Sequence, residues 1–268
     1  MDKPRVMGVL NLTSDSFSDG GQFLDPQAAL AQARRLLAQG ADMLDLGAES
    51  TRPGAAPVDA AVEIERLVPL IRAIRAESDA PISVDTMKPQ TARACIAAGA
   101  TMWNDVTALQ HAPDSLQVAA ELGCEVVLMH MQGEPATMQQ APAYADVVGE
   151  VADFLAARAA AAIAAGVARE RIWLDPGIGF GKHPTAHNLP LLANLDRIVA
   201  LGFPVLLGAS RKQFISAVAG PAPADARLGG SIAAALAGAA AGVAAVRVHD
   251  VPETLQALKV WAAIAKAR

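Results

Sequence analysis

The sequence contains few aromatic residues, few cysteines and no excess of positive charge. Aromatic residues make up 4% of 268 residues, so the core must be built mainly from Ala, Val, Leu and Ile. Cys95 and Cys124 lack the spacing of a metal site, and we expect two buried, reduced thiols in a reducing compartment. The net charge of -5 argues against a nucleic-acid-binding protein, which needs clustered Lys and Arg. A small anionic ligand remains compatible, because it responds to local charge.

The sequence also lacks a hydrophobic run that is long enough to span a membrane. The most apolar late stretch, residues 232–246, is rich in Ala and Gly and shorter than the roughly 20 strongly apolar residues that a span needs. We predict a buried helix followed by a strand there. The first residues lack the apolar core and cleavage site of a signal peptide, so we expect a cytoplasmic protein without a membrane partner.

Short apolar runs alternate with longer helical patterns along the whole chain. Hydrophobic residues make up 53% and charged residues 18%, which suits a large core. The predicted strands are Arg5–Leu10, Asp42–Leu46, Ile82–Val84, Thr101–Asn104, Val126–Met129, Arg171–Leu174, Pro204–Leu207 and Ala244–Val248. The predicted helices are Pro26–Gln39, Asp59–Glu77, Pro89–Ala98, Asp114–Leu122, Ala145–Ala165, His187–Ala200, Ala224–Ala241 and Pro252–Ala267. Eight such units predict an α/β protein with a single (β/α)8 TIM-barrel domain over residues 1–268; a doubly wound open sheet is the alternative.

Every predicted strand has a polar residue at or near its carboxyl end. These residues are Asn11, Asp45, Asp85, Asn104, His130, Asp175, Ser210 and the pair Arg247 and His249. Any one of them could simply make a turn or cap a helix, and His130 is better explained as a core histidine. Together they indicate one functional face, because the carboxyl ends of barrel strands meet at the same end. Two long connections, residues 11–25 and 47–58, predict loops that cover this face.

Seven motifs, in order along the chain, resemble those of the dihydropteroate synthases. They are Asn-Leu-Thr-Ser-Asp-Ser-Phe-Ser-Asp-Gly-Gly at 11–21, Leu-Asp-Leu-Gly-Ala-Glu-Ser-Thr-Arg-Pro-Gly at 44–54, Ile-Ser-Val-Asp-Thr at 82–86, Trp-Asn-Asp-Val at 103–106, Leu-Asp-Pro-Gly-Ile-Gly-Phe-Gly-Lys at 174–182, Gly-Ala-Ser-Arg-Lys at 208–212 and Arg-Val-His-Asp-Val at 247–251. Ser14 departs from the family, in which many members carry Pro. The resemblance implies an enzyme that condenses a dihydropterin methyl diphosphate with 4-aminobenzoate and releases pyrophosphate.

The resemblance also implies a division of the site. Asp85, Asn104, Asp175 and Lys212 match the pterin-binding positions, and the family's anion contacts fall on Thr51, Arg247 and His249. Arg52 can add positive charge to that group. Asn11 matches the position that contacts Mg²⁺, and one amide oxygen is a weak ligand, so we expect Mg²⁺ to bind together with the diphosphate. Side-chain alternation in 247–249 predicts that Arg247 and His249 form a two-pronged clamp on the diphosphate.

The 4-aminobenzoate site is expected to form from the two long loops and the seventh strand. Phe17 and Pro53 can sandwich the ring, Ser210 can donate to the carboxylate, and Lys212 supports it by charge. The mechanism implied is loss of pyrophosphate followed by attack of the arylamine nitrogen. We expect Asp85, Lys212, Arg247 and His249 to carry the catalytic electrostatics, with no nucleophilic side chain.

Two alternatives remain open at this point. A methyltetrahydrofolate-dependent methyltransferase barrel would share Asp85, Asn104 and Asp175, but it would not need the Ser-Arg-Lys motif or the clamp. A paralogue that binds pterin without catalysis would keep the same residues. The family resemblance further implies a homodimer and sensitivity to sulfonamides as mimics of 4-aminobenzoate.

Overall fold

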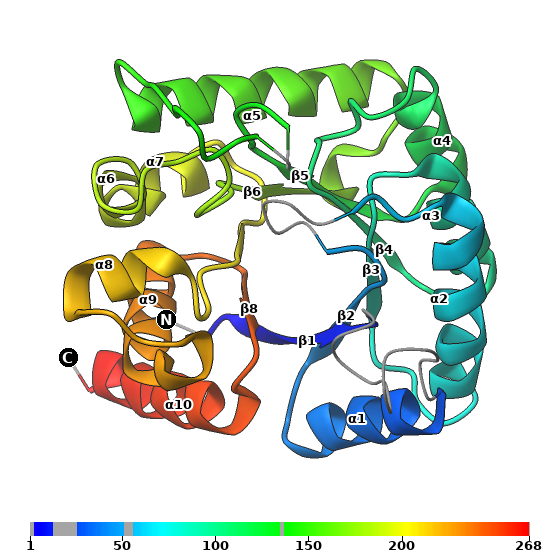
Figure 1. Ribbon diagram of the computed structural model, residues 1–268, viewed down its shortest axis with the longest axis horizontal. Coiled ribbons are helices and arrows are strands. Elements are labelled where there is room, and N and C mark those ends of the chain that lie inside the picture. Colours follow the sequence, from blue (N-terminus) through cyan, green and yellow to red (C-terminus); the bar gives the residue numbers. More distant parts are fainter. Residues whose placement is uncertain (1–2, 13–25, 51–55, 135–136, 268) are drawn as a thin grey trace.

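Short parallel strands form the centre of the molecule, and helices surround them (Figure 1). The structure is a computed structural model that describes residues 3–12, 26–50, 56–134 and 137–267. The strands are β1 Arg5–Asn11, β2 Met43–Gly47, β3 Ile82–Asp85, β4 Met102–Asp105, β5 Glu125–Met129, β6 Ile172–Asp175, β7 Leu206–Leu207 and β8 Ala245–Val248. They form one sheet in the order β6-β5-β4-β3-β2-β1-β8-β7, and the pairings are parallel.

The two end strands of this sheet meet. Leu174 of β6 forms a parallel bridge with Val205, the residue before β7. The Leu174 amide also donates to the Pro204 carbonyl oxygen at 2.9 Å. The sheet therefore curves round into the arrangement of a TIM barrel, as the alternating pattern predicts, and the open-sheet alternative is wrong.

The helices largely follow the predicted ranges. They are α1 Pro26–Ala38, α2 Ala60–Arg75, α3 Pro89–Ala97, α4 Ser115–Leu122, α5 Val147–Ala164, α6 Asn188–Ala193, α7 Leu195–Val199, α8 Gln213–Ala219, α9 Leu228–Ala241 and α10 Val251–Lys266, with short 3₁₀ turns at Arg169–Arg171 and Ala224–Ala226. The prediction of one helix over His187–Ala200 is wrong, because the helix is interrupted at Asn194. The Asn194 side-chain amide donates to the Pro190 carbonyl at 2.8 Å and competes with the helical backbone pattern.

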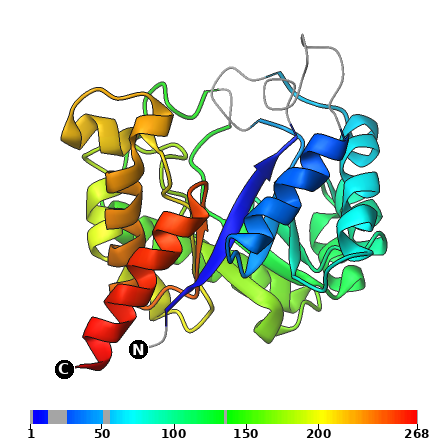
Figure 2. The same cartoon turned by 90° about the horizontal axis from the view of Figure 1, so that it is seen from below.

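One helix was not predicted at all. Helix α8 lies between β7 and α9, and Figure 2 shows it in gold at the end of the molecule toward which the arrow of β1 points. Its sequence, Gln-Phe-Ile-Ser-Ala-Val-Ala, is too short to give a clear helical period. Because α8 starts directly after Lys212, it sets the direction in which the chain leaves the seventh strand.

Apolar side chains fill two separate layers. The larger layer lies between the strands and the helices and includes Leu44, Val84, Val126 and Leu258. The smaller one fills the inside of the barrel. Cys95 and Cys124 are buried free thiols, as predicted. Over the part of the chain that the structure describes, no helix is long and apolar enough to cross a membrane.

Candidate active site

A plug of apolar side chains closes the inside of the barrel and forms the floor of the candidate site. It consists of Met7, Met43, Met102, Val127, Trp173, Leu206 and Ala245, each from a different strand. Side chains of a strand alternate between its two faces, so the residue two positions farther along also points inward. Four polar residues stand at that level: Asp45, Asn104, Asp175 and Arg247. The alternation thus places a polar layer directly on the apolar plug.

Arg247 joins the Asp45 carboxylate of this layer to the Asp85 carboxylate at the end of β3. Its Nε donates to Asp45 Oδ2 at 2.6 Å, and its Nη2 donates to Asp85 Oδ2 at 2.9 Å. The Asp45 side chain is fully buried, and the Asn104 amide lies 3.4 Å from its Oδ1. Asp45 is a site residue that the motif comparison did not assign. Its only sequence signal was its place at the carboxyl end of a strand.

The ionisation of this cluster reflects its burial. Burial raises the pKa of Asp85 to about 7; the charge of Arg247 opposes this change, and the charge of Asp45 adds to it. Burial by itself lowers the pKa of Arg247, but the two carboxylates outweigh it and hold that pKa above its usual range. Arg247 is therefore charged, whereas Asp85 can hold or release a proton near neutral pH.

Asp175 and Lys212 form the opposite side of the polar layer. Asp175 Oδ1 accepts a hydrogen bond from the Gly177 amide at 2.7 Å, so the turn interpretation of this residue is also correct. Burial raises the pKa of Asp175, and the charge of Lys212 opposes that rise. Burial lowers the pKa of Lys212 to about 8, with Asp175 opposing. Each group therefore favours the charged form of the other.

Gly208 leaves room among these side chains. A Cβ atom at Gly208 would lie 3.7 Å from Asp175 Oδ2, 3.9 Å from Lys212 Nζ and 4.0 Å from Arg247 Cδ. Such distances are ordinary contacts, so a small side chain would fit without ligand. It would, however, occupy the space between the Asp175 carboxylate and the side chains of Lys212 and Arg247.

Lys212 contacts the turn that follows β6. Its Nζ donates to the Ile178 carbonyl oxygen and lies 4.6 Å from the centre of the Phe180 ring. Lys182 contacts the same turn, and its side chain is 1% exposed. Lys182 is the last residue of the motif at 174–182, and nothing in that motif indicates which way its side chain points.

Ser210 and His249 are paired with each other. Ser210 Oγ lies 3.0 Å from His249 Nδ1 and accepts from the His249 backbone amide at 3.3 Å. Arg211 has a φ of 60°, an uncommon conformation for a residue other than glycine, and pairs with Asp250. These contacts tie the segment after β7 to the segment after β8. Arg247 and His249 thus contact different partners here, and the two-pronged clamp on the diphosphate stays a prediction.

A second buried network lies behind Asp85. Glu63 of α2 is fully buried and accepts hydrogen bonds from Thr86 at 2.9 Å and Thr91 at 2.7 Å. Lys88 Nζ lies 3.4 Å from Glu63 Oε1 and 2.6 Å from Glu49 Oε2. The network fixes the segment after β3. Sequence reasoning missed it because a hydrophobic pattern does not show that Glu63 contacts Thr86 and Thr91, which lie 23 and 28 residues farther along the chain.

Asn11 is the last residue of β1 and lies opposite Gly47. A Cβ atom at Gly47 would lie 3.7 Å from Asn11 Oδ1 and 3.4 Å from Asp85 Cβ, so Asn11 and Asp85 both border Gly47. Among the described residues, no group of three or more His, Cys, Asp or Glu could hold a metal ion. Four of the predicted site residues, Phe17, Thr51, Arg52 and Pro53, lie outside the described residues.

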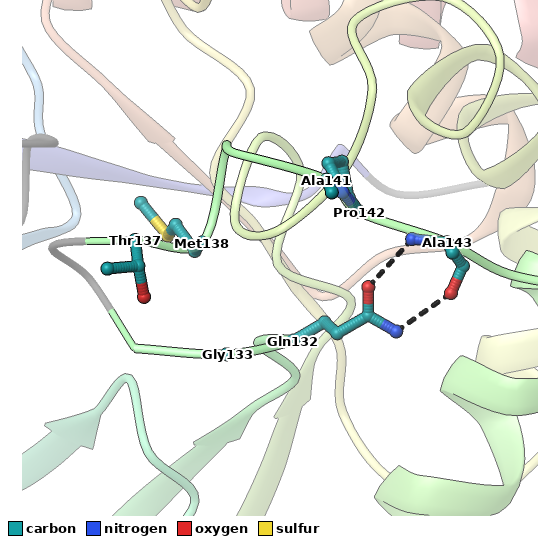
Figure 3. A pocket seen from close by; sticks show the side chains of 7 residues that line it. All are labelled: Gln132, Gly133, Thr137, Met138, Ala141, Pro142 and Ala143. Carbon is teal, nitrogen blue, oxygen red and sulfur yellow. Dashed lines mark hydrogen bonds between the residues drawn. The ribbon is translucent and has the colours of Figure 1, made fainter.

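His130 is a buried core residue, as the sequence favours, and it lies under the loop between β5 and α5. Burial and the charge of Lys182 lower the pKa of His130 to about 3, so the ring is neutral. The loop itself encloses a pocket of about 320 Å³, lined by Gln132, Gly133, Thr137, Met138, Ala141, Pro142 and Ala143. Figure 3 shows Gln132 closing this loop through two hydrogen bonds to the Ala143 backbone. The pocket belongs to this loop and not to the polar layer.

Known proteins resemble this chain over nearly its whole length. A family model described as pterin binding enzyme matches residues 7–249. The dihydropteroate synthase of Neisseria meningitidis serogroup B is 49% identical, over 98% of this chain and 94% of the relative. The structure of Xanthomonas albilineans dihydropteroate synthase with 4-aminobenzoic acid matches with a TM-score of 0.92 and 49% identity, over 98% of this chain and 94% of that one. The enzyme from that organism in complex with 7,8-dihydropteroate matches with a TM-score of 0.88 and 46% identity at the same coverage.

Proposed function

The chain belongs to the dihydropteroate synthases, a family of pterin-binding enzymes, and we propose how its side chains divide the work of that reaction. The enzyme is a transferase that joins a dihydropterin methyl diphosphate to 4-aminobenzoate. The bond between the pterin methylene carbon and the diphosphate oxygen breaks, and its electron pair leaves with pyrophosphate. The arylamine nitrogen then bonds to the methylene carbon and loses a proton.

The pterin ring binds on the polar layer, in contact with Asp85, Asn104, Asp175 and Lys212. The observation that carries this proposal is the convergence of these side chains above the apolar plug, around the space that Gly208 leaves. A pterin edge presents both donors and acceptors, and carboxylates, an amide and an ammonium group can match it with short directional bonds. On binding, the ring replaces some of the present hydrogen-bond partners of these side chains.

The diphosphate binds at the outer edge of this layer, where Arg247 and His249 face it together with Asn11, Thr51 and Arg52. When the pterin ring binds Asp85, Arg247 loses part of its contact with Asp45 and Asp85 and binds the phosphate oxygens instead. Its charge then stabilises the negative charge that develops on the leaving group. Lys212 and Asp85 hold the ring that carries the opposite, developing positive charge.

Mg²⁺ fits this edge only if the protein and the substrate share its coordination. The structure offers it Asn11 Oδ1, a single neutral oxygen, and no carboxylate group dedicated to a metal among the described residues. Mg²⁺ commonly keeps several waters and shares substrate phosphates. We therefore assign Asn11 and the diphosphate oxygens as its ligands, and the ion would supply charge neutralisation of the leaving group.

The aminobenzoate binds last, next to the methylene carbon, with Phe17 and Pro53 on its ring and Ser210 and Lys212 near its carboxylate. Ser210 must then turn its hydroxyl from His249 toward the ligand. Sulfonamides, as mimics of 4-aminobenzoate, are expected to occupy the same place. We also propose a single domain over residues 1–268, a homodimer and a cytoplasmic location, without nucleic-acid or membrane partners.

Pyrophosphate release from a dihydropterin methyl diphosphate tests this function directly. It is measured with Mg²⁺, with and without 4-aminobenzoate, while dihydropteroate is followed in parallel. Release that matches dihydropteroate formation supports the proposal. Tight pterin binding without turnover would support a paralogue without catalysis. Methyl transfer from methyltetrahydrofolate to a corrinoid, with no pyrophosphate release from the dihydropterin methyl diphosphate, would support a methyltransferase.

A further inference from the structure

The turn after β6 is held from two sides by two lysines. It comprises residues 176–181, and it connects Asp175 to the buried Lys182. Lys212 contacts the turn from the site through the Ile178 carbonyl and the Phe180 ring. Lys182 contacts it from behind, at the Gly177 carbonyl at 2.9 Å and the Phe180 carbonyl at 3.1 Å. Successive carbonyls of one turn thus accept from opposite sides.

Lys182 is itself held by His130. Its Nζ lies 2.9 Å from His130 Nδ1 and 3.3 Å from the His130 carbonyl oxygen. The His130 ring packs edge-on against Phe154, with centroids 4.9 Å apart. Because the partners of Lys182 lie at the end of β5 and in the turn, the ammonium group connects that strand to the turn.

The backbone of the turn also lies too close to β5 for a side chain to intervene. Gly177 has a φ of +65°, and a Cβ atom there would come within 1.9 Å of the His130 carbonyl oxygen. A Cβ atom at Gly179 would lie 3.3 Å from Lys212 Cδ on the other side. The position of the turn therefore determines where the Lys212 side chain can lie.

We propose that Lys182, supported by His130, is a positioning residue that holds the 176–181 turn so that Ile178 and Phe180 direct Lys212 into the pterin site. Lys182 does not touch substrate in this proposal. It acts through the turn on Lys212, and the inference rests on the proposed role of Lys212 in pterin binding. Asp175 is affected in the same way, because its carboxylate accepts from Gly177, the first residue that the Lys182 ammonium holds.

A double-mutant cycle tests this role. Lys182→Met keeps the aliphatic stem and removes the ammonium group, and Lys212→Met does the same on the site side. The affinity for dihydropterin methyl diphosphate is measured by calorimetry with Mg²⁺ in the parent, both single variants and the double variant. We expect Lys182→Met to weaken binding about 10- to 100-fold, which lies in the range of coupling between residues of one contact network. In the Lys212→Met background, the same change should have less than about a threefold effect.

Arg75 provides the matched control. Its guanidinium also binds loop carbonyls, those of Ser78 and Gly99, but these lie after α2 and α3, at the end of the barrel opposite to the site. Arg75→Met should reduce the melting temperature without changing pterin diphosphate affinity by more than about twofold in either background. A general loss of stability would therefore not imitate the coupling.

The outcomes are distinguishable. If Lys212→Met leaves pterin diphosphate affinity unchanged, the assignment of Lys212 to the pterin site is wrong, and the inference falls with it. If Lys212→Met weakens binding but the effects of the two changes simply add, only the positioning role is overturned. If Lys182→Met does not fold, His130→Phe replaces it in the cycle. That change keeps the ring packing and removes one partner of Lys182, and a lack of coupling to Lys212→Met there would equally overturn the proposal.

Discussion

Replacing Arg247 with alanine should damage the binding of the diphosphate far more than the binding of the pterin ring. In the structure, Arg247 neutralises Asp45 and Asp85 through bonds of 2.6 and 2.9 Å. Arg247→Ala therefore removes two things at once: the proposed donor to the phosphate oxygens and the counter-charge of Asp45 and Asp85. Only the first effect depends on whether the ligand carries a diphosphate.

The ratio of two affinities separates these effects. Calorimetry would compare a dihydropterin methyl diphosphate with the same pterin lacking the diphosphate, in the parent and in Arg247→Ala. Loss of the counter-charge weakens both ligands through Asp85 and cancels in the ratio. Truncation of one partner of a buried charge pair often costs about 2–5 kcal/mol. At about 1.4 kcal/mol per factor of ten, the affinity ratio should fall by a factor of about 30 or more.

Asp45→Asn is the matched control for this experiment. It keeps Arg247 and removes the charge that competes with the diphosphate for the guanidinium group, so the ratio should stay constant or rise. Breaking a buried pair commonly costs about 3–5 kcal/mol of stability, so the melting temperature of both variants is recorded first. An equal loss of affinity for both ligands in Arg247→Ala would show that Arg247 serves only to neutralise the carboxylates.

Three further variants test other parts of the site. Phe17→Ala should reduce 4-aminobenzoate turnover at least about tenfold by removing part of an aromatic contact, and a collapse of pterin diphosphate affinity in calorimetry would show that the pocket is divided differently. Gly208→Ala should fold normally, because its neighbours lie at ordinary contact distances, yet bind pterin more than about tenfold more weakly; an unchanged affinity would place the ring elsewhere. The folded enzyme keeps the Asp85 proton up to about pH 7, and the unfolded chain loses it near 3.8, so the contribution of Asp85 to the free energy of unfolding falls as the pH rises between these values. Asp85→Asn should reduce that fall in denaturation curves from pH 4 to 8, and parallel curves for both proteins would contradict the raised pKa.

The fold was predictable from the sequence because its signals are local. Each predicted strand is a short apolar run with a polar residue at or near its carboxyl end. Side-chain alternation then places Asp45, Asn104, Asp175 and Arg247 inside the barrel. Helices α6 and α7 were predicted as one, since the side-chain bond of Asn194 to Pro190 does not appear in a hydrophobic pattern. Helix α8 was missed because seven residues span only about two turns.

The partners inside the site were less predictable than its members. Alternation correctly turns Arg247 inward, but it cannot show that Asp45 and Asp85 meet its guanidinium from β2 and β3. Lys182 is an extreme case. A lysine after a glycine-rich turn normally extends into solvent, and burial of its ammonium is tolerable only because three carbonyls and a ring nitrogen surround it. Two of these carbonyls lie in the adjacent turn, but His130 lies 52 residues earlier in the chain, and no sequence period indicates that contact.

The charges of the polar layer explain why the site can be stable without ligand and still bind one. Arg247 and Lys212 lie among Asp45, Asp85 and Asp175, so the buried charges nearly balance, and the raised pKa of Asp85 provides the remaining adjustment. In the proposed arrangement, a pterin ring that binds Asp85 frees Arg247 to pair with the diphosphate. Binding of the ring and binding of the leaving group would therefore be coupled through one guanidinium group. A ligand that has only the ring or only the diphosphate would replace only one side of the contact between Arg247 and Asp85.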